Sequence, residues 1–410
     1  MYYFFYLPVG TEARVRGTPW GTILLAAANV GLFLFFRLFR GWEPEFYDLT
    51  LRAGEPALLN ALTASFLHAG WFHLASNMLY LGILGPPVET RLGHTRFLVA
   101  YLGCAGLANL AQAAWILRFI PDQMSVPILG SSGAIAGIMG LFLVRLYFVR
   151  LRFAAITFLL LQGVARGTRF ALPSAVAIAL WFALQAVYQM AEPVSGTAYI
   201  SHLGGLLFGA VIALVMGMAS EGRLERRLVL GNRYAERANW FAALGEYDAY
   251  LSARPDDAEV LVQAARVHRV THQESASLKR FRAGIASHLR RGAIQEACDV
   301  FDEMKRLLGD VTLEPEALLR VARGYEVVRR PSDASRAYEA YGRRFPDAPG
   351  SAAALLKSAE IERGTLNNPG RARFLYQELM SRRLPPEVER ITRERMRVAE
   401  DAVARQRGPS

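Results

Sequence analysis

The stretch Gly130-Ser131-Ser132-Gly133-Ala134-Ile135-Ala136-Gly137 begins a run of residues apolar enough to lie within a membrane. A second apolar run contains Ser201-His202-Leu203-Gly204-Gly205. Polar side chains inside a bilayer are costly unless they find partners, so they usually mark a functional site. The two stretches together predict a serine–histidine pair within a bundle of membrane helices, which is typical of a hydrolase.

The apolar residues are concentrated in the first half of the 410-residue chain. Runs of roughly 20 apolar residues recur there, and this length crosses about 30 Å of hydrocarbon. The second half is charged, rich in helix-forming residues and free of such runs. We therefore expect a cytoplasmic N-terminal segment, a membrane domain, a linker and a cytosolic repeat domain, at residues 1–17, 18–218, 219–232 and 233–405 respectively.

Six segments are candidates for membrane spans, and the first is expected to be a span and not a cleavable signal. The segment Phe153–Gly163 is too short to span alone and is expected to be re-entrant or interfacial. The six segments are approximately residues 19–38, 71–88, 97–117, 131–149, 171–190 and 199–218.

Arginine is unevenly distributed over the loops between these spans. One side of the bundle carries most of it, and such an excess marks the cytoplasmic side. Both termini are therefore expected in the cytoplasm, in agreement with an even number of spans, and Ser132 and His202 then begin helices at the outer side. The arginines that set this orientation are Arg14, Arg16, Arg91, Arg96, Arg150, Arg152, Arg166, Arg169, Arg223, Arg226 and Arg227.

The net charge of +11 comes almost wholly from arginine, since only Lys279, Lys305 and Lys357 are lysines. A nucleic-acid surface is one interpretation, but arginines on cytoplasmic loops and solvated helix faces explain the balance better, so no nucleic-acid partner is expected. Cys104 and Cys298 lie in different predicted domains. They give neither a disulfide framework nor a metal-binding spacing.

Small–aromatic pairs recur in the second half at intervals of 37–38 residues, namely Ala297/Phe301, Ala334/Tyr338 and Ala372/Tyr376. Such a period predicts a short solenoid of helix pairs. The segment Trp240–Asp257 resembles a tetratricopeptide unit, although the period is longer than the 34 residues of that family. A generic array of helical hairpins is the alternative, and either gives an all-α chain.

Ser132 needs a base within hydrogen-bonding reach to act as a nucleophile, and His202 is the natural candidate. Gly130 and Gly133 remove side-chain bulk around the serine, so that a substrate backbone can approach. Gly133 and Gly137 form one smooth helix face, and Gly205 and Gly209 form another, so the two helices can pack closely. The alternative is that Ser132 and His202 are packing residues bonded to backbone. No Asp or Glu lies near them in the spans, which favours a dyad over a full triad.

A third group of polar residues is His68, His73 and Asn77. His73 and Asn77 are four residues apart, so they share one face of a helix. Both can donate hydrogen bonds to an oxyanion formed by attack on a carbonyl group. A metal site at His68 and His73 is the competing interpretation, but no third ligand accompanies them.

These three pieces together resemble the rhomboid family of intramembrane serine proteases, over about residues 18–218. Asn77–Phe97 also resembles that family's second span and following loop. The resemblance implies a six-helix bundle whose water-filled cavity opens to the outer side, and cleavage of transmembrane substrates without a cofactor.

By the same resemblance, Ser132 is the nucleophile and His202 is the general base and then acid. His73, Asn77 and the backbone N–H of Ser132 would form the oxyanion hole, and His68 would shape the cavity. The chain departs from the family's pattern at three places: Ser131 replaces a common alanine, Ala136 replaces an aromatic that packs on the catalytic histidine, and the loop at Arg40-Gly41-Trp42 lacks a Trp-Arg pair.

The leading hypothesis is thus an active intramembrane serine endopeptidase that acts on transmembrane proteins, surrounded by membrane lipid, in a bacterial inner membrane. The alternative is an inactive adaptor that binds transmembrane helices without cutting them; a transporter is less favoured because inverted repeats are missing. The cytosolic repeat domain either recruits a protein partner or is a passive appendage. His268, His272 and His288 are expected to be surface residues on its helices.

Overall fold

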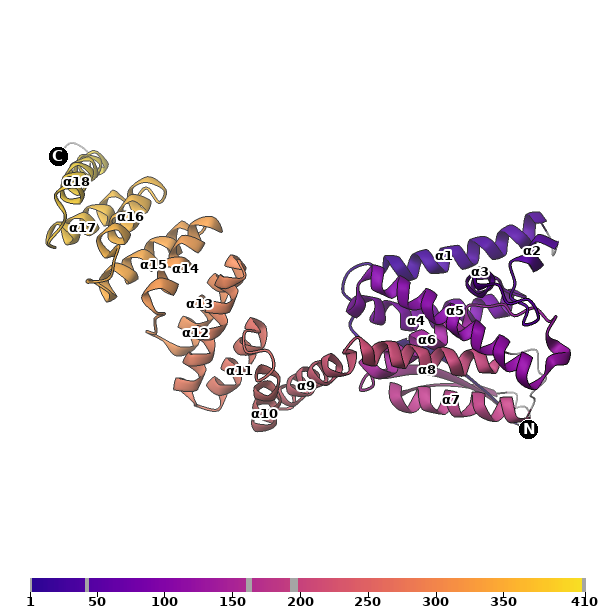
Figure 1. The fold of residues 1–410 in the computed structure, drawn as a ribbon. Coiled ribbons are helices and arrows are strands. Elements are labelled where there is room, and N and C mark those ends of the chain that lie inside the picture. The colour runs from indigo at the N-terminus through magenta and orange to yellow at the C-terminus, as the bar shows by residue number, and fades with distance from the viewer. Residues whose placement is uncertain (1, 41–43, 160–163, 192–197, 408–410) are drawn as a thin grey trace. The chain divides into compact units, whose positions relative to one another are not determined.

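The computed structural model describes residues 2–40, 44–159, 164–191 and 198–407. The chain divides into two compact units, Met1–Arg226 and Arg227–Ser410 (Figure 1). The first is a helical bundle with a small β-sheet, and the second is a succession of helices.

The first unit has a helix at each of the six positions where the sequence predicts a span. Shorter helices, α2 (Pro44–Asp48) and α3 (Leu58–Thr63), lie between the first two of them. The six helices are α1 (Trp20–Phe35), α4 (Trp71–Leu92), α5 (His94–Phe119), α6 (Ser132–Arg145), α7 (Ser174–Ala191) and α8 (Tyr199–Val215).

Three helical segments of the described residues are long and apolar enough to cross a membrane, namely Trp20–Phe39, His94–Phe119 and Ser174–Ala191. A fourth candidate is α8 together with α9 (Met218–Glu236), although the pair is bent by 80°. α6 is apolar but shorter. The chain is therefore an integral membrane protein, while the number of six spans stays a prediction.

α6 lies at the centre of this unit, in contact with α4, α5 and α8. Nearly all of its residues are buried, and glycines explain how the neighbouring helices come so close. A Cβ atom at Gly205 would clash with the carbonyl oxygen of Gly133, and one at Gly209 would clash with that of Gly137. The two glycine faces expected from the sequence therefore meet, with no room for any side chain between the backbones.

A three-stranded antiparallel sheet, in the order β1-β2-β3, packs beside these helices. Its strands are β1 (Tyr2–Thr11), β2 (Arg150–Leu159) and β3 (Val164–Pro173). This sheet was not predicted from the sequence, because β1 and β2 are far apart along the chain. β2 alternates buried Leu151 and Phe153 with exposed Arg152, the period-2 pattern of a strand with one covered face.

Three further expectations concern particular segments of this unit. Phe153–Gly163, expected to be re-entrant or interfacial, is a β-strand as far as Leu159, and residues 160–163 are outside the described part of the chain. The predicted N-terminal segment supplies strand β1, with Pro8 opposite Phe153. The atypical loop at Arg40-Gly41-Trp42 lies largely outside the described residues.

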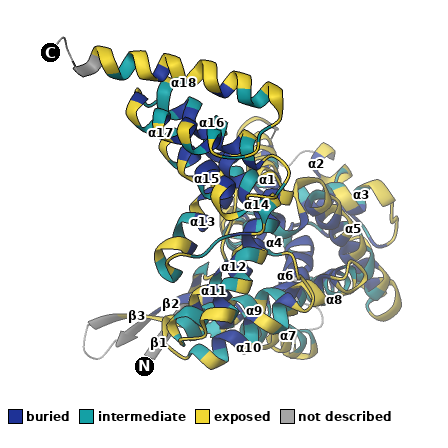
Figure 2. Cartoon of the chain, turned by 90° about the vertical axis from the view of Figure 1, so that its left-hand side faces the viewer, coloured by how far each residue is buried: buried dark blue, intermediate teal, exposed yellow. Residues whose placement is uncertain are grey.

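The second unit is an array of consecutive helices in which each packs against the next. The Ala–aromatic pairs that repeat in the sequence are buried in it, as the predicted solenoid requires. Figure 2 shows the buried faces in blue between exposed outer faces. The helices that follow α9 are α10 (Trp240–Leu251), α11 (Ala258–Val270), α12 (Glu274–Arg290), α13 (Ile294–Leu308), α14 (Pro315–Val327), α15 (Pro331–Arg344), α16 (Ser351–Gly364), α17 (Pro369–Met380) and α18 (Pro386–Arg407).

The predicted linker 219–232 falls within helix α9. The predicted surface histidines lie on or next to helices of the second unit, and His288 is buried, not exposed as expected. It lies on α12, whose inner face also carries Phe281 and Ile285, so its helical position places it inward.

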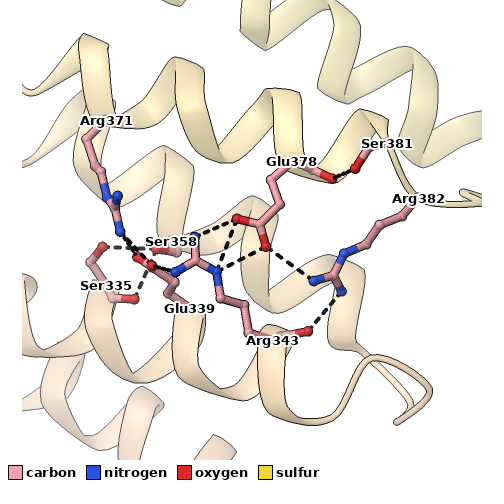
Figure 3. A network of polar contacts seen from close by, with 9 residues as sticks. Ser335, Glu339, Arg343, Ser358, Arg371, Glu378, Ser381 and Arg382 are labelled. Carbon is pink, nitrogen blue, oxygen red and sulfur yellow. Dashed lines mark hydrogen bonds and ion pairs between the residues drawn. The ribbon is translucent and has the colours of Figure 1, made fainter.

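Charged pairs connect the last helices of the array (Figure 3). Arg371 of α17 donates to Glu339 of α15 at 2.5 and 2.7 Å, and Arg343 of α15 donates to Glu378 of α17 at 2.6 Å. The hydrogen bond from Arg343 holds the pKa of Glu378 below its usual range. These pairs fix the register between helices that are not consecutive in sequence.

Candidate active site

Ser132 and His202 lie side by side. Ser132 is the first residue of α6 and His202 lies in the first turn of α8, and Ser132 Oγ is 2.7 Å from His202 Nε2. Both side chains are half-buried, whereas the neighbouring Ser131 is fully buried. The contact follows from the glycine-to-glycine packing of α6 on α8, which brings the starts of the two helices together.

His73 lies against the backbone that leads into Ser132. Gly130 has φ +120°, which side chains rarely tolerate, and a Cβ atom there would lie 2.7 Å from His73 Cε1 and 2.8 Å from His73 Nε2. The glycine is thus required twice, for its conformation and for the space that the imidazole takes. This arrangement holds His73 next to the serine.

Asn77 lies one turn further along α4 than His73 and is 6% exposed. Its Nδ2 has no hydrogen-bond partner among the described residues. Buried amide donors are nearly always paired, so an unpaired one calls for an explanation. A free amide donor one turn from His73 is suited to an oxygen that becomes charged during a reaction.

His68 is buried just behind this group. Its Nε2 lies 3.2 Å from Ser131 Oγ, and its ring centroid lies 5.0 Å from that of His73. It does not reach Ser132. Among the described residues, no three His, Cys, Asp or Glu side chains are grouped as a metal site would require.

Three side chains surround the imidazole of His202 on its other side. Nδ1 lies 2.8 Å from Oε1 of Gln185 on α7. The rings of Trp181 and Tyr199 lie 5.9 and 6.4 Å from that of His202. Aromatic neighbours thus come from α7 and α8, and Ala136 of α6 is instead buried against α8. Trp181 and Tyr199 thus supply the aromatic contact with His202 that the family's pattern places at the position of Ala136.

Gln185 was not predicted from the sequence, because it is not a carboxylate and belongs to no local motif. The available signal was a polar amide inside the apolar helix Ser174–Ala191. A polar residue at that depth usually has a partner or a function.

A second buried network fixes the backbone beside His202. The N–H of Ser201 donates to Gln112 Oε1 at 3.0 Å. Asn109 Nδ2 donates to Ser65 Oγ at 3.0 Å and to the carbonyl of Ala61 at 2.9 Å. These bonds join the start of α8 to α5 and to the segment before α4, so the elements that carry the site are held together.

An apolar cavity of about 380 Å³ lies between α4, α6, α7 and the sheet. Its lining includes Leu84, Met139, Phe153, Ala177, Trp181 and Leu184. Because Trp181 also contacts His202, the cavity reaches the neighbourhood of the site.

The fold and the site thus define a helical membrane protein with a serine–histidine pair and a buried, unpaired amide donor on α4. Residues 55–219 match the family model of the rhomboid domain, in agreement with the resemblance of the sequence motifs to the rhomboid family.

Three similar proteins also carry the word rhomboid in their names. The chain is 29% identical over 141 residues to "Putative rhomboid protease YdcA" of Bacillus subtilis, covering 33% of this chain and 67% of that protein. It is 26% identical over 211 residues to "Rhomboid protein 1, mitochondrial" of Saccharomyces cerevisiae, covering 51% and 57%. It is 29% identical over 227 residues to "Rhomboid protease GluP" of Bacillus subtilis, covering 53% and 39%. The match thus spans 39–67% of the length of these relatives.

Among solved structures, the chain is similar to a tetratricopeptide repeat protein from Parabacteroides merdae, with a TM-score of 0.19 and 15% identity over 55% of this chain and 91% of that one. It is also similar to the tetratricopeptide domain of P58(IPK), with a TM-score of 0.21 and 12% identity over 79% and 89%.

Proposed function

We propose that the chain is an intramembrane serine endopeptidase that hydrolyses peptide bonds in or near the transmembrane segments of other proteins. The observation that carries the proposal is the 2.7 Å contact between Ser132 Oγ and His202 Nε2 inside a rhomboid domain. Two of the similar Bacillus proteins carry the word protease in their names.

In this mechanism His202 takes the proton of Ser132 as the hydroxyl oxygen attacks the scissile carbonyl carbon. The resulting oxyanion accepts hydrogen bonds from Asn77 Nδ2, from His73 and from the backbone N–H of Ser132. His202 then gives its proton to the leaving amine, which completes the acyl-enzyme. A water molecule, deprotonated by His202, repeats the sequence and releases the second product.

The free amide of Asn77 and the position of His73 over Gly130 support the oxyanion assignment. Gly130, Gly133, Gly205 and Gly209 support the site by permitting close backbone approach. His68 has an indirect role through Ser131.

For the substrate we propose an apolar membrane-spanning segment, with apolar side chains seated in the 380 Å³ cavity. A cavity lined by apolar side chains favours apolar groups, because a polar group would find no hydrogen-bond partner there. The arginine asymmetry supports cytoplasmic termini. A bacterial inner membrane is proposed as the location of the protein. The second unit is proposed to bind a cytosolic protein, as stacked helix pairs commonly do.

The test is cleavage of a model transmembrane substrate by the purified protein in liposomes. Wild type is compared with Ser132→Ala and His202→Ala, and Ser132 is probed with a fluorophosphonate. We expect cleavage and labelling by wild type alone. Equal cleavage by all three would point to a contaminating protease. Neither cleavage nor labelling by wild type would favour the alternative, an inactive adaptor that binds transmembrane helices.

A further inference from the structure

We propose that Gln185 is a positioning residue for His202, so that the site operates as Ser132–His202–Gln185 and not as a dyad. This inference rests on the proposed function and names a residue that the family pattern does not supply. The observation is a continuous hydrogen-bonded line across the imidazole, with Ser132 Oγ 2.7 Å from Nε2 and Gln185 Oε1 2.8 Å from Nδ1.

The chemistry of the imidazole decides which way these bonds run. To accept the proton of Ser132, Nε2 must be unprotonated, and a neutral imidazole then carries its single proton on Nδ1. An N–H at Nδ1 needs an acceptor, and the amide oxygen of Gln185 is placed to accept it. Gln185 therefore favours the tautomer in which His202 can act as a base.

The same bond acts during the reaction. When His202 takes the proton of Ser132 it becomes an imidazolium, and the carbonyl dipole of Gln185 then points its negative end at the Nδ1–H. Charged hydrogen bonds are stronger than neutral ones, so the contact stabilises the charged state more than the resting state. An amide supplies this orientation without placing a second full charge in the membrane, where a carboxylate would be costly.

The position of Gln185 on α7 adds a geometric consequence. Trp181 lies one turn earlier on the same face of α7 and also contacts His202. This face of α7 therefore contacts the imidazole through both residues. Only Ser174 and Ile178 are buried residues of α7, which makes it lightly packed in this unit. The alignment of His202 therefore depends on where α7 sits, through these two side chains.

The first arm of the test is turnover of the model transmembrane substrate in liposomes. Gln185→Leu removes the acceptor at nearly constant volume, and we expect kcat to fall about 10–100-fold with KM within about twofold of wild type. Gln189→Leu is the matched control, since it makes the same change one turn further along α7, and it should retain wild-type kcat.

Gln185→Glu separates positioning from packing. It keeps the acceptor and adds a negative charge, which favours the protonated imidazole. We expect activity to persist, with the acidic limb of the pH profile of kcat/KM moved to higher pH. The titratable groups facing His202 are His73 from α4 and Tyr199 from α8, and both are common to all variants. Equal loss of kcat in Gln185→Glu and Gln185→Leu would mean that Gln185 acts through packing alone, and would overturn the proposal.

The second arm does not depend on cleavage. ¹⁵N chemical shifts of the His202 ring should show a protonated Nδ1 in the wild type and a redistribution of the proton in Gln185→Leu. An unprotonated Nδ1 in the wild type, or a tautomer that Gln185→Leu leaves unchanged, would overturn the proposal. So would wild-type kcat in Gln185→Leu. Absence of cleavage by wild type would count against the proposed function, while the ring nitrogens would still decide the role of Gln185.

Discussion

Glu225 lies 2.8 Å from Arg145, the last residue of the helix that begins with Ser132. The same carboxylate also pairs with Arg91 at the end of α4. One residue of α9 thus holds the ends of two helices whose other ends carry the candidate nucleophile and the proposed oxyanion donors. The burial of Glu225 alone would raise its pKa, but hydrogen bonds from Arg91 and the charges of both arginines hold it below its usual range.

We expect Glu225→Gln to lower stability by about 1–3 kcal/mol, because it leaves two largely buried guanidinium groups without their anion. The effect depends on pH. A carboxylate whose folded pKa is lowered stabilises the fold above its unfolded pKa of about 4.5, and this contribution is lost as the pH falls through the folded pKa. In thermal unfolding in detergent, the melting temperature of the variant should therefore lie below that of wild type at pH 7. This difference in melting temperature should narrow below about pH 4.5.

The exposed Glu55 gives a matched control for that measurement, since Glu55→Gln makes the same chemical change at a solvent-exposed side chain. It should unfold as wild type does across the pH range. A gap between wild type and Glu225→Gln that stays constant through acid would contradict the assignment of the stabilisation to the ionised Glu225.

The glycine contacts of α6 and α8 predict a sharp contrast between alanine variants. Gly205→Ala would place a methyl group against the carbonyl of Gly133 and separate the helices that bring Ser132 to His202. We expect the free energy of unfolding to fall by about 1–3 kcal/mol or more, and we expect Ser132 to lose its labelling by the fluorophosphonate. Gly103→Ala on α5 has open space around the new methyl group and should keep both properties. Labelling of Gly205→Ala at the wild-type rate would count against close backbone packing.

Asn77→Ala tests the unpaired amide. If Asn77 Nδ2 donates to the oxyanion, its loss should lower kcat about 100-fold with little change in KM, because the bond forms only in the transition state. Ser76→Ala is the neighbouring control, since its hydroxyl bonds to the carbonyl of His73 within the helix. A rise in KM at unchanged kcat would show instead that Asn77 binds the ground state of the substrate.

The sequence predicted the elements that rest on local patterns, and missed those that rest on pairing at a distance. Apolar runs and small residues predicted the six helix positions. Gly133 and Gly205 predicted that α6 packs closely against α8. The sheet was missed because β1 and β2 each find their partner far along the chain. Gln185 was missed for a related reason: it has no local motif, and only the packing of α7 on α8 brings it to His202.

The remaining prediction concerns the apolar cavity between α4, α6 and α7. Ala177 lines it, and Ala177→Phe would fill part of its volume of about 380 Å³ without touching the serine–histidine pair. If apolar substrate side chains occupy the cavity, KM for the transmembrane substrate should rise several-fold, while labelling of Ser132 by a small fluorophosphonate should be unchanged, since that probe needs only the reactive pair. Ala186→Phe on the same helix, outside the residues that line the cavity, controls for bulk on α7. An equal rise in KM in both variants would mean that the helix position matters and the cavity does not. A normal KM in Ala177→Phe would place the substrate elsewhere on the bundle.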